Sequence, residues 1–234
     1  GEAYGYQGSG NGRSTTAIWA IGASAAVNAG AQQALTGATT SDFGGSVASA
    51  GDVNGDGYGD VIVGAYQDAS GTVKTYVYHG SASGIGSTAA QTLTGENSGD
   101  YFGWSVASAG DVNGDGYDDV IIGAYEYDSS DDEGRAYIYH GSSSGIGSSA
   151  VRTLTGAGTD YFFGRSVASA GDVNGDGYAD VIIGAEKYST YTGRAYVYHG
   201  GSSGISASVS SILTGEATGD KFGHSVASAG DVNG

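Results

Sequence analysis

The sequence has no cysteine, no proline and no methionine among its 234 residues. The chain therefore contains neither disulfides nor a thiol nucleophile, and its 46 glycines indicate many turns instead of rigid linkers. Lysine and arginine number only 8 against 25 aspartate and glutamate residues, which gives a formal charge of −17. Such a surface repels the phosphates of nucleic acid and favours cations or basic partners, so we expect no nucleic-acid partner.

Long apolar segments are also missing. No apolar run approaches the ~18 to 20 residues that a membrane-spanning helix needs, so we expect no membrane span. The beginning, GEAYGYQGSG, lacks the basic and apolar regions of a signal peptide. We expect any export signal to lie outside this chain.

An internal repeat is the strongest feature that is present. The dipeptide Phe-Gly recurs at spacings of 59, 61 and 59 residues, and SVASAGDVNG follows each copy. The first three copies continue with DGYGDVIVGA, DGYDDVIIGA or DGYADVIIGA, then a variable loop, then a segment such as RAYIYHG, and finally a segment such as RTLTG. The repeat unit is therefore about 60 residues long.

Each unit predicts four short strands separated by glycine-rich turns, and no segment has helical periodicity. The expected fold class is all-β: a β-propeller of four-stranded antiparallel blades, with about four repeats in this chain. A β-solenoid is the competing fold, but its coils are usually shorter. The predicted units are a partial blade at 1–37, blades at 38–95, 96–155 and 156–214, and the start of a next blade at 215–234.

The two ends of the chain follow the same register. Residues 1–13 resemble residues 123–135, and residues 17–22 take the place of a third strand, so the chain opens where a second strand ends. It closes at Gly234, inside the fourth copy of the segment DVNGDGYxD, an aspartate-rich turn. We expect the chain to be part of a larger propeller or array; the alternative is a four-bladed ring in which the terminal segments share one blade and leave an exposed edge.

The aspartate-rich turn DVNGDGYGD predicts a calcium loop on a β-hairpin. Alternate residues of a tight loop point their oxygens at one centre, which suits a hard cation with six to eight oxygen ligands. The glycine at position six permits the bend, and the tyrosine at position seven would contribute its backbone carbonyl. The candidate ligands are Asp52, Asn54, Asp56, Tyr58 and Asp60; Asp111, Asn113, Asp115, Tyr117 and Asp119; Asp172, Asn174, Asp176, Tyr178 and Asp180; and, in the incomplete fourth copy, Asp231 and Asn233.

Asp, Asn and Gly are also ordinary turn residues, which is the alternative interpretation of any one copy. Three copies that keep every ligand position favour calcium, and magnesium fits less well because it demands a rigid octahedron. Three calcium ions, one for each complete loop, would bring the formal charge from −17 to −11. We expect affinities of roughly 0.1 to 1 mM, typical of extracellular modules, so that the loops would stay empty in cytosol.

With the Phe-Gly pair, the DVNGDGYxD loop and the closing VIIGA in one unit, the sequence resembles the FG-GAP repeats of the integrin α-subunit propeller and its bacterial relatives. GA stands here where that family often has GAP, and no repeat keeps the proline. The resemblance covers essentially the whole chain. It implies a propeller of usually seven blades with calcium in some hairpin loops, and an extracellular module for recognition or scaffolding.

One face of the predicted disc is variable. The aspartate loops and the GSASGIG-type loops share one face and are nearly invariant among the repeats, whereas the second-to-third-strand loops and the residue after each Phe-Gly differ. Exposed aromatic residues beside acids suit a protein or glycan ligand, although loops that are merely solvated would also vary. The candidate ligand-binding residues are Trp104, Tyr125, Tyr127, Asp131, Asp132, Arg165, Tyr188 and Tyr191.

Two sets of repeated residues are predicted to be structural. His79, His140 and His199 hold one position at the end of the third strand, and equivalent residues of different blades lie far apart around a disc. The phenylalanine of each Phe-Gly is predicted to pack between blades.

Catalysis has little support, because nearly every His and Asp belongs to the repeat and no GxSxG motif occurs. The first functional hypothesis is a secreted or cell-surface calcium-binding propeller for adhesion or recognition. The second is a structural protein that assembles with copies of itself into a calcium-stabilised extracellular array or filament. A weaker third is the non-catalytic domain of an exported enzyme.

Overall fold

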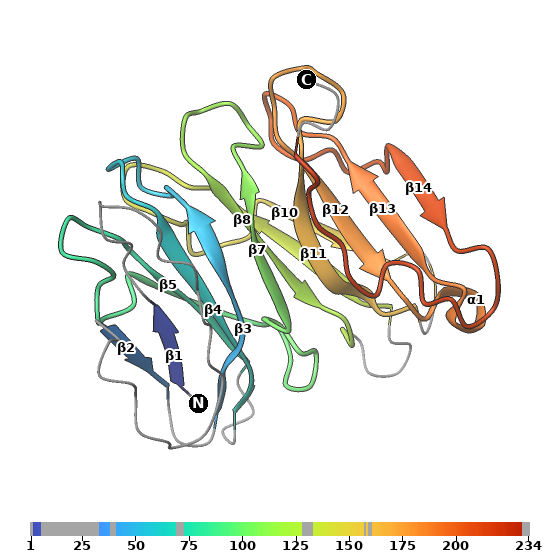
Figure 1. Cartoon of the computed structure of the whole chain (residues 1–234), viewed down its shortest axis with the longest axis horizontal. Helices are drawn as coiled ribbons and strands as arrows, with labels where there is room; N and C mark the ends of the chain where they lie inside the picture. Colours follow the sequence, from blue (N-terminus) through green and yellow to red (C-terminus); the bar gives the residue numbers. More distant parts are fainter. Residues whose placement is uncertain are drawn as a thin grey trace, which may run out of the picture.

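The structure is a computed structural model that describes residues 2–5, 33–37, 41–68, 73–127, 133–156, 158 and 161–230. Three four-stranded antiparallel sheets stand side by side in chain order (Figure 1). In each sheet the strands follow one another in sequence order, so that every connection is a hairpin. The predicted all-β architecture of four-stranded antiparallel blades is confirmed.

The strands of each blade are called first to fourth in chain order. Their bounds are β3 (Ser41–Gly51), β4 (Asp60–Asp68), β5 (Lys74–Tyr78) and β6 (Gln91–Thr94); β7 (Ser105–Gly110), β8 (Asp119–Ala124), β9 (Arg135–Tyr139) and β10 (Arg152–Thr155); and β11 (Phe163–Gly171), β12 (Asp180–Ala185), β13 (Arg194–Tyr198) and β14 (Ser211–Thr214). The second strands are buried along most of their length because their sheets are covered on both faces, as the run Asp119–Ala124 shows.

A separate two-stranded sheet lies near the amino terminus. Its strands β1 (Glu2–Gly5) and β2 (Gln33–Thr36) are antiparallel, with Glu2 opposite Thr36. The repeat register makes β2 a fourth strand, and it would put residues 17–22 between the two strands. Residues 17–22 lie outside the described residues.

One short helical turn interrupts the β pattern. The turn α1 (Tyr188–Tyr191) connects β12 to β13, and Ser189 and Thr190 have positive φ angles of 48° and 58°. A turn of four residues is too short to produce the periodicity by which a helix is predicted. Its sequence therefore predicted only a variable loop.

The blades radiate from their first strands. Strand β3 lies against β7, and β7 lies against β11, whereas the fourth strands β6, β10 and β14 are outermost in their sheets. This is the arrangement of propeller blades around an axis.

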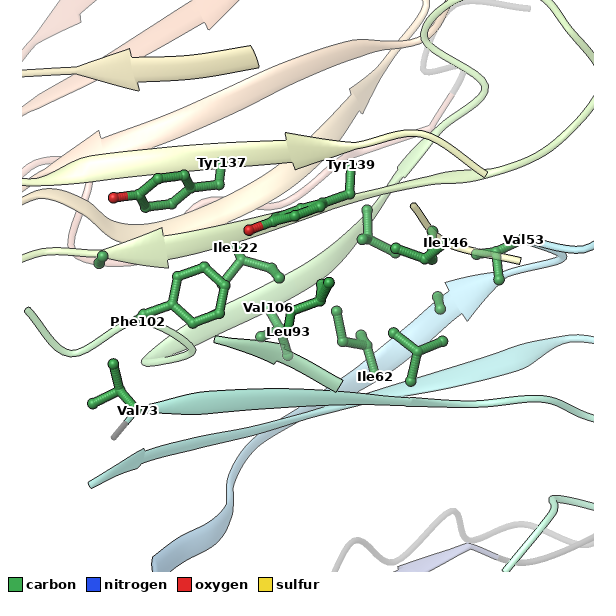
Figure 2. Close-up of a cluster of buried hydrophobic side chains, with 14 residues drawn as sticks. Val53, Ile62, Val73, Leu93, Phe102, Val106, Ile122, Tyr137, Tyr139 and Ile146 are labelled. Carbon is green, nitrogen blue, oxygen red and sulfur yellow. The ribbon is translucent and has the colours of Figure 1, made fainter. Parts of the chain in front are cut away.

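The hydrophobic core lies between successive blades. Figure 2 shows Val53, Ile62 and Leu93 of the first complete blade packed against Phe102 and Ile122 of the second. A second cluster of the same composition joins the second blade to the third. Each blade therefore depends on its neighbour for burial of its apolar side chains.

The phenylalanines of the first three Phe-Gly pairs are buried, and Phe102 and Phe163 lie in these two clusters between blades, as predicted. The ring of Phe102 meets the ring of Tyr137 edge-on, with centroids 5.4 Å apart, and Tyr139 lies at 6.5 Å. Phe43 and Phe163 make the same pair of contacts with the tyrosines of their own third strands.

The glycines of the second, third and fourth Phe-Gly pairs bring two blades into backbone contact. A Cβ on Gly123, in the second strand of one blade, would come within 2.0 Å of the carbonyl oxygen of Gly164 in the next. Gly64 meets Gly103, and Gly184 meets Gly223, in the same way. The glycines of Phe-Gly and of GA are thus the two sides of one close approach between blades.

Replacement of Phe102 by alanine should lower the free energy of unfolding by about 3–5 kcal/mol, because it empties a site in the core between two blades. Phe222 is the matched control, since it holds the same repeat position but is 40% exposed, against 1% for Phe102. For Phe222→Ala, urea denaturation should show that the free energy of unfolding falls by only about 1 kcal/mol. Equal losses for the two variants would contradict the assignment of the core to the blade interfaces.

Candidate metal loops and variable face

Each complete aspartate loop connects the first and second strands of a blade. The loops at 52–59, 111–118 and 172–179 lie between β3 and β4, between β7 and β8, and between β11 and β12. The turn that follows the third strand approaches the same loop, since the Gly80 N–H lies 2.8 Å from an oxygen of Asp60. The prediction that these two connections share one face is confirmed.

The first aspartate organises the backbone of its loop. Asp52 accepts hydrogen bonds from the N–H groups of Gly55 and Asp56 with Oδ1, and from that of Gly57 with Oδ2, at 2.8, 3.1 and 2.8 Å. Asp111 and Asp172 accept the equivalent three bonds. In the third loop these bonds, that of Gly177 above all, lower the pKa of the exposed Asp172 carboxyl.

The third and fifth positions lie beside each other at the tip of the loop. The Asn54 amide donates to Asp56 Oδ2 at 2.9 Å and accepts from the Asp56 N–H at 3.0 Å, while Asp56 Oδ1 accepts from the Tyr58 N–H. The same bonds recur in the other two complete loops. Three oxygen-bearing side chains are thus held on one short turn.

The glycine at the sixth position is required by the backbone. Gly57 has a φ of +85°, and the space where its Cβ would lie is open. The constraint at this position is therefore conformational and not steric.

The ninth position has a structural role that its spacing did not reveal. Asp60 is buried and accepts from the Val53 N–H at 2.9 Å as well as from Gly80. Asp119 and Asp180 are buried on equivalent bonds. Burial raises the pKa of Asp60, and it raises the pKa of Asp119 to about 7 against the lowering effect of its two backbone bonds. These carboxylates fasten the aspartate loop to the turn after the third strand.

The donor atoms of the loops have the chemistry that a hard cation requires. All are carboxylate, amide or carbonyl oxygens, and each carboxylate oxygen that accepts one hydrogen bond keeps a further lone pair. Within the described ranges, however, no three His, Asp or Glu side chains stand together as a group able to hold a metal ion. The loops therefore fit calcium by donor type, with their backbone ordered by hydrogen bonds. Asp231 and Asn233 lie outside the described residues.

The repeated histidines lie next to these loops. His140 Nδ1 is 3.2 Å from the Asn113 amide nitrogen, and burial lowers its pKa against the opposing effect of Asp115 and Asp111. The other ring nitrogen of His140 faces Gly204 of the next blade, just as His79 faces Gly145. These contacts agree with the structural role predicted for the histidines.

The structure brings three of the predicted ligand-binding residues together. Trp104 and Tyr125 have ring centroids 4.9 Å apart, and the Arg165 guanidinium lies over both rings, at 4.4 and 4.7 Å. Tyr125 is only 6% exposed, and Arg165 forms an ion pair of 3.2 Å with the buried Glu186. This stack runs across consecutive blades.

Other residues complete the stack. Tyr66 and Tyr101 pack on Trp104, and Phe162 packs on Tyr125. His224 contacts Glu186. Tyr66, Tyr125 and Glu186 all follow the GA of their repeats, and this shared position is the signal that could have grouped them.

The remaining candidates lie apart from this stack. Arg135 covers the ring of Tyr127 at 3.5 Å, and Arg194 covers Tyr188 at the same distance. Tyr191 is partly exposed, and Lys221 lies 5.3 Å from its ring. Asp131 and Asp132 lie outside the described residues.

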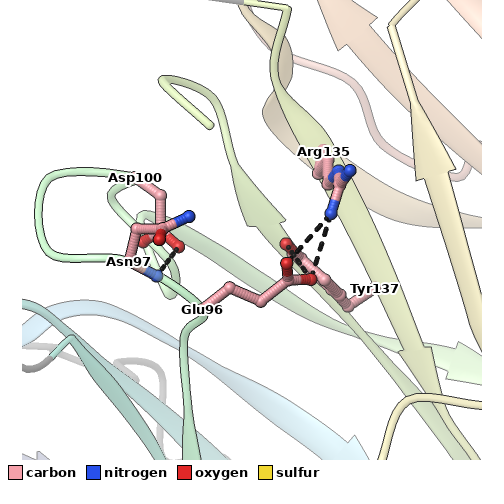
Figure 3. Close-up of polar contacts among 5 residues, drawn as sticks. All are labelled: Glu96, Asn97, Asp100, Arg135 and Tyr137. Atoms are coloured by element: carbon pink, nitrogen blue, oxygen red, sulfur yellow. Dashed lines mark hydrogen bonds and ion pairs between the residues drawn. The ribbon is translucent and has the colours of Figure 1, made fainter. Parts of the chain in front are cut away.

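Arg135 also belongs to a polar cluster that connects two blades (Figure 3). Its Nη1 donates to both oxygens of Glu96 at 3.1 Å, and the Tyr137 hydroxyl donates to Glu96 at 3.1 Å. The nearby Asp100 accepts from the N–H groups of Asn97 and Phe102, and burial raises its pKa. The cluster fixes the connection between β6 and β7.

Among the described residues, no helix has the length and apolar character needed to cross a bilayer.

Comparison with known proteins identifies the repeat. The FG-GAP repeat family matches residues 43–79, 102–139 and 163–198. Integrin alpha-6 of Gallus gallus is 41% identical over 145 residues, which are 59% of this chain and 13% of the relative. Integrin alpha-4 of Xenopus laevis is 34% identical over 182 residues, which are 75% of this chain and 17% of the relative. Integrin alpha-7 of Homo sapiens is 38% identical over 145 residues, or 61% and 12%.

The matched region thus covers most of this chain but less than a fifth of each of these relatives. The three matched repeats each fall on the first three strands of one four-stranded sheet. The chain is an FG-GAP repeat protein, similar over this region to the integrin α subunits.

Proposed function

We propose that the chain is an extracellular β-propeller module for adhesion or recognition whose aspartate loops bind calcium. The observation that carries this proposal is the same oxygen-rich loop, with the same backbone hydrogen bonds, on the same face of three consecutive blades. An ordinary turn needs no more than one aspartate or asparagine side chain, whereas these loops keep one at positions one, three, five and nine.

In the first loop, Asp52, Asn54 and Asp56 would supply side-chain oxygens and Tyr58 its carbonyl. Asp60 would add the lone pairs that its two backbone bonds leave free. When bound, calcium supplies positive charge that offsets the repulsion among the carboxylates. The residues themselves order the loop and keep the first and second strands in register.

Calcium would act on stability more than on shape. A site whose dissociation constant is tenfold below the free calcium concentration adds about 1.4 kcal/mol to the free energy of unfolding. Sites of millimolar affinity are filled outside cells and empty inside them, which supports a secreted or cell-surface location. The similarity to integrin α subunits supports the same location and a binding role instead of a catalytic one.

The variable face is the proposed site for a protein or glycan ligand. Tyr188 and Tyr191 present aromatic surface beside the α1 turn, and the stack of Trp104, Tyr125 and Arg165 forms a rigid centre for this face. Because Tyr125 is buried, we assign the contact with a ligand to the partly exposed residues around it.

Calcium at 2 mM should raise the melting temperature above its value in chelator, by about 2–4 °C for each kcal/mol gained. Asp115→Ala should reduce this gain and lower the number of bound ions from three to two by titration calorimetry, because it removes the fifth-position ligand of one loop. Asp42→Ala is the control, since it removes an equally exposed charge outside the loops. A calcium effect that survives Asp115→Ala undiminished would refute the ligand assignment.

Trp104→Ala should lower the free energy of unfolding by about 1–3 kcal/mol, because the ring packs on Tyr66, Tyr125 and Arg165. Tyr191→Ala should change it by less than about 0.5 kcal/mol, since that ring is at the surface. An unchanged melting temperature for Trp104→Ala would mean that the tryptophan does not stabilise the contact between blades and is available to bind a ligand.

A further inference from the structure

Each aspartate loop is held by the blade that follows it. The carbonyl oxygen of Asp52 accepts the Asp118 N–H at 3.1 Å, and that of Val53 accepts the Ser142 N–H at 3.1 Å. At the next interface, the carbonyl oxygens of Asp111 and Val112 accept the N–H groups of Ala179 and Gly201, both at 3.0 Å. The first two positions of a loop are therefore fixed from outside their own blade.

A tyrosine ring completes this contact. A Cβ on Gly55, at the fourth position of the first loop, would lie 2.7 Å from Cε1 of Tyr117. A Cβ on Gly114 would lie at the same distance from Cε1 of Tyr178. The tyrosine at position seven of one loop thus packs on the glycine at position four of the loop before it.

The third loop has no such tyrosine packed on its fourth-position glycine in the described part of the chain. Nothing described lies within 4 Å of the Cβ position of Gly175. Val173 is 57% exposed there, whereas Val53 and Val112 are completely buried. Tyr58, which has no preceding loop in the described chain to pack on, is itself exposed.

We propose that Tyr178 is a positioning residue for the calcium loop at 111–119, and that Tyr117 has the same role for the loop at 52–60. The inference rests on the proposed calcium binding and adds to it that each loop is ordered by a side chain of the next blade. A loop ordered before the ion arrives loses less conformational entropy on binding.

The contact also links the loops to one another. If the next blade orders a loop for calcium, then calcium in that loop must stabilise the docking of the next blade by the same free energy. The ion would therefore strengthen blade interfaces as well as single hairpins.

The test isolates the middle loop. Asp56→Ala and Asp176→Ala remove the fifth-position ligands of the first and third loops, so that titration calorimetry of this double variant with calcium chloride reports on the loop at 111–119. In that background, Tyr178→Leu should weaken calcium binding by about tenfold, as loss of a supporting residue does at other metal sites. Tyr178→Phe keeps the ring and should restore the affinity.

Tyr161→Leu is the matched control. Tyr161 is a half-buried tyrosine of the same blade as Tyr178, and its ring packs on Tyr188. Its replacement should leave the affinity of the middle loop unchanged within about twofold. An equal or larger effect of Tyr161→Leu than of Tyr178→Leu would overturn the inference, because the loss of affinity would then come from the stability of the blade as a whole.

A second measurement needs no substitution at Tyr178. Hydrogen exchange followed by mass spectrometry, in the same background, should show that calcium protects amides of the next blade around Ala179 and Gly201 as well as those of the middle loop. Protection confined to residues 111–119 would overturn the inference while calcium binding stands. If neither the background nor the unaltered chain binds calcium, the proposed function itself fails.

Discussion

The contact on which the structure depends is the approach of one blade's backbone to a glycine of its neighbour. The carbonyl oxygen of Gly164 occupies the space in which any side chain at Gly123 would lie, and two further interfaces repeat this contact. Because any side chain at these second-strand glycines would collide with the backbone of the neighbouring blade, the Phe-Gly and GA pairs set how closely two blades can approach. Phe102 and Phe163, beside two of these contacts, then fill the core that this spacing creates.

The aspartate loops use their carboxylates for two purposes. The first aspartate gathers the N–H groups of its own loop, and the ninth is buried where the loop meets the turn after the third strand. Both kinds of bond hold carboxyl oxygens against backbone N–H groups, so the loops are ordered around acidic residues before any cation is considered. The proposed calcium binding therefore adds to an architecture that hydrogen bonds already specify.

Local patterns were sufficient to predict the blades, because spacing and alternation are visible along the chain. Packing of the Phe-Gly phenylalanines between blades was predicted, but the other contacts between blades were not, since they join residues about 60 positions apart that share no local pattern, such as Tyr117 and Gly55. Spacing assigned Asp60 as a ligand but could not show that Gly80 donates to it. Variation among repeats selected Trp104, Tyr125 and Arg165 among eight candidates, but it did not indicate that these three meet or that Glu186 pairs with the arginine.

Because the ninth aspartate is buried, closure of the hairpin does not depend on the charges at the other positions of the loop. Asp119 holds its hairpin through the N–H groups of Val112 and Gly141, neither of which belongs to a cation ligand set. A blade could thus exchange the acids at positions one and five for neutral residues and still close its hairpin on the ninth. Repeats of this kind are free to diverge in ionic content blade by blade while their architecture stays the same.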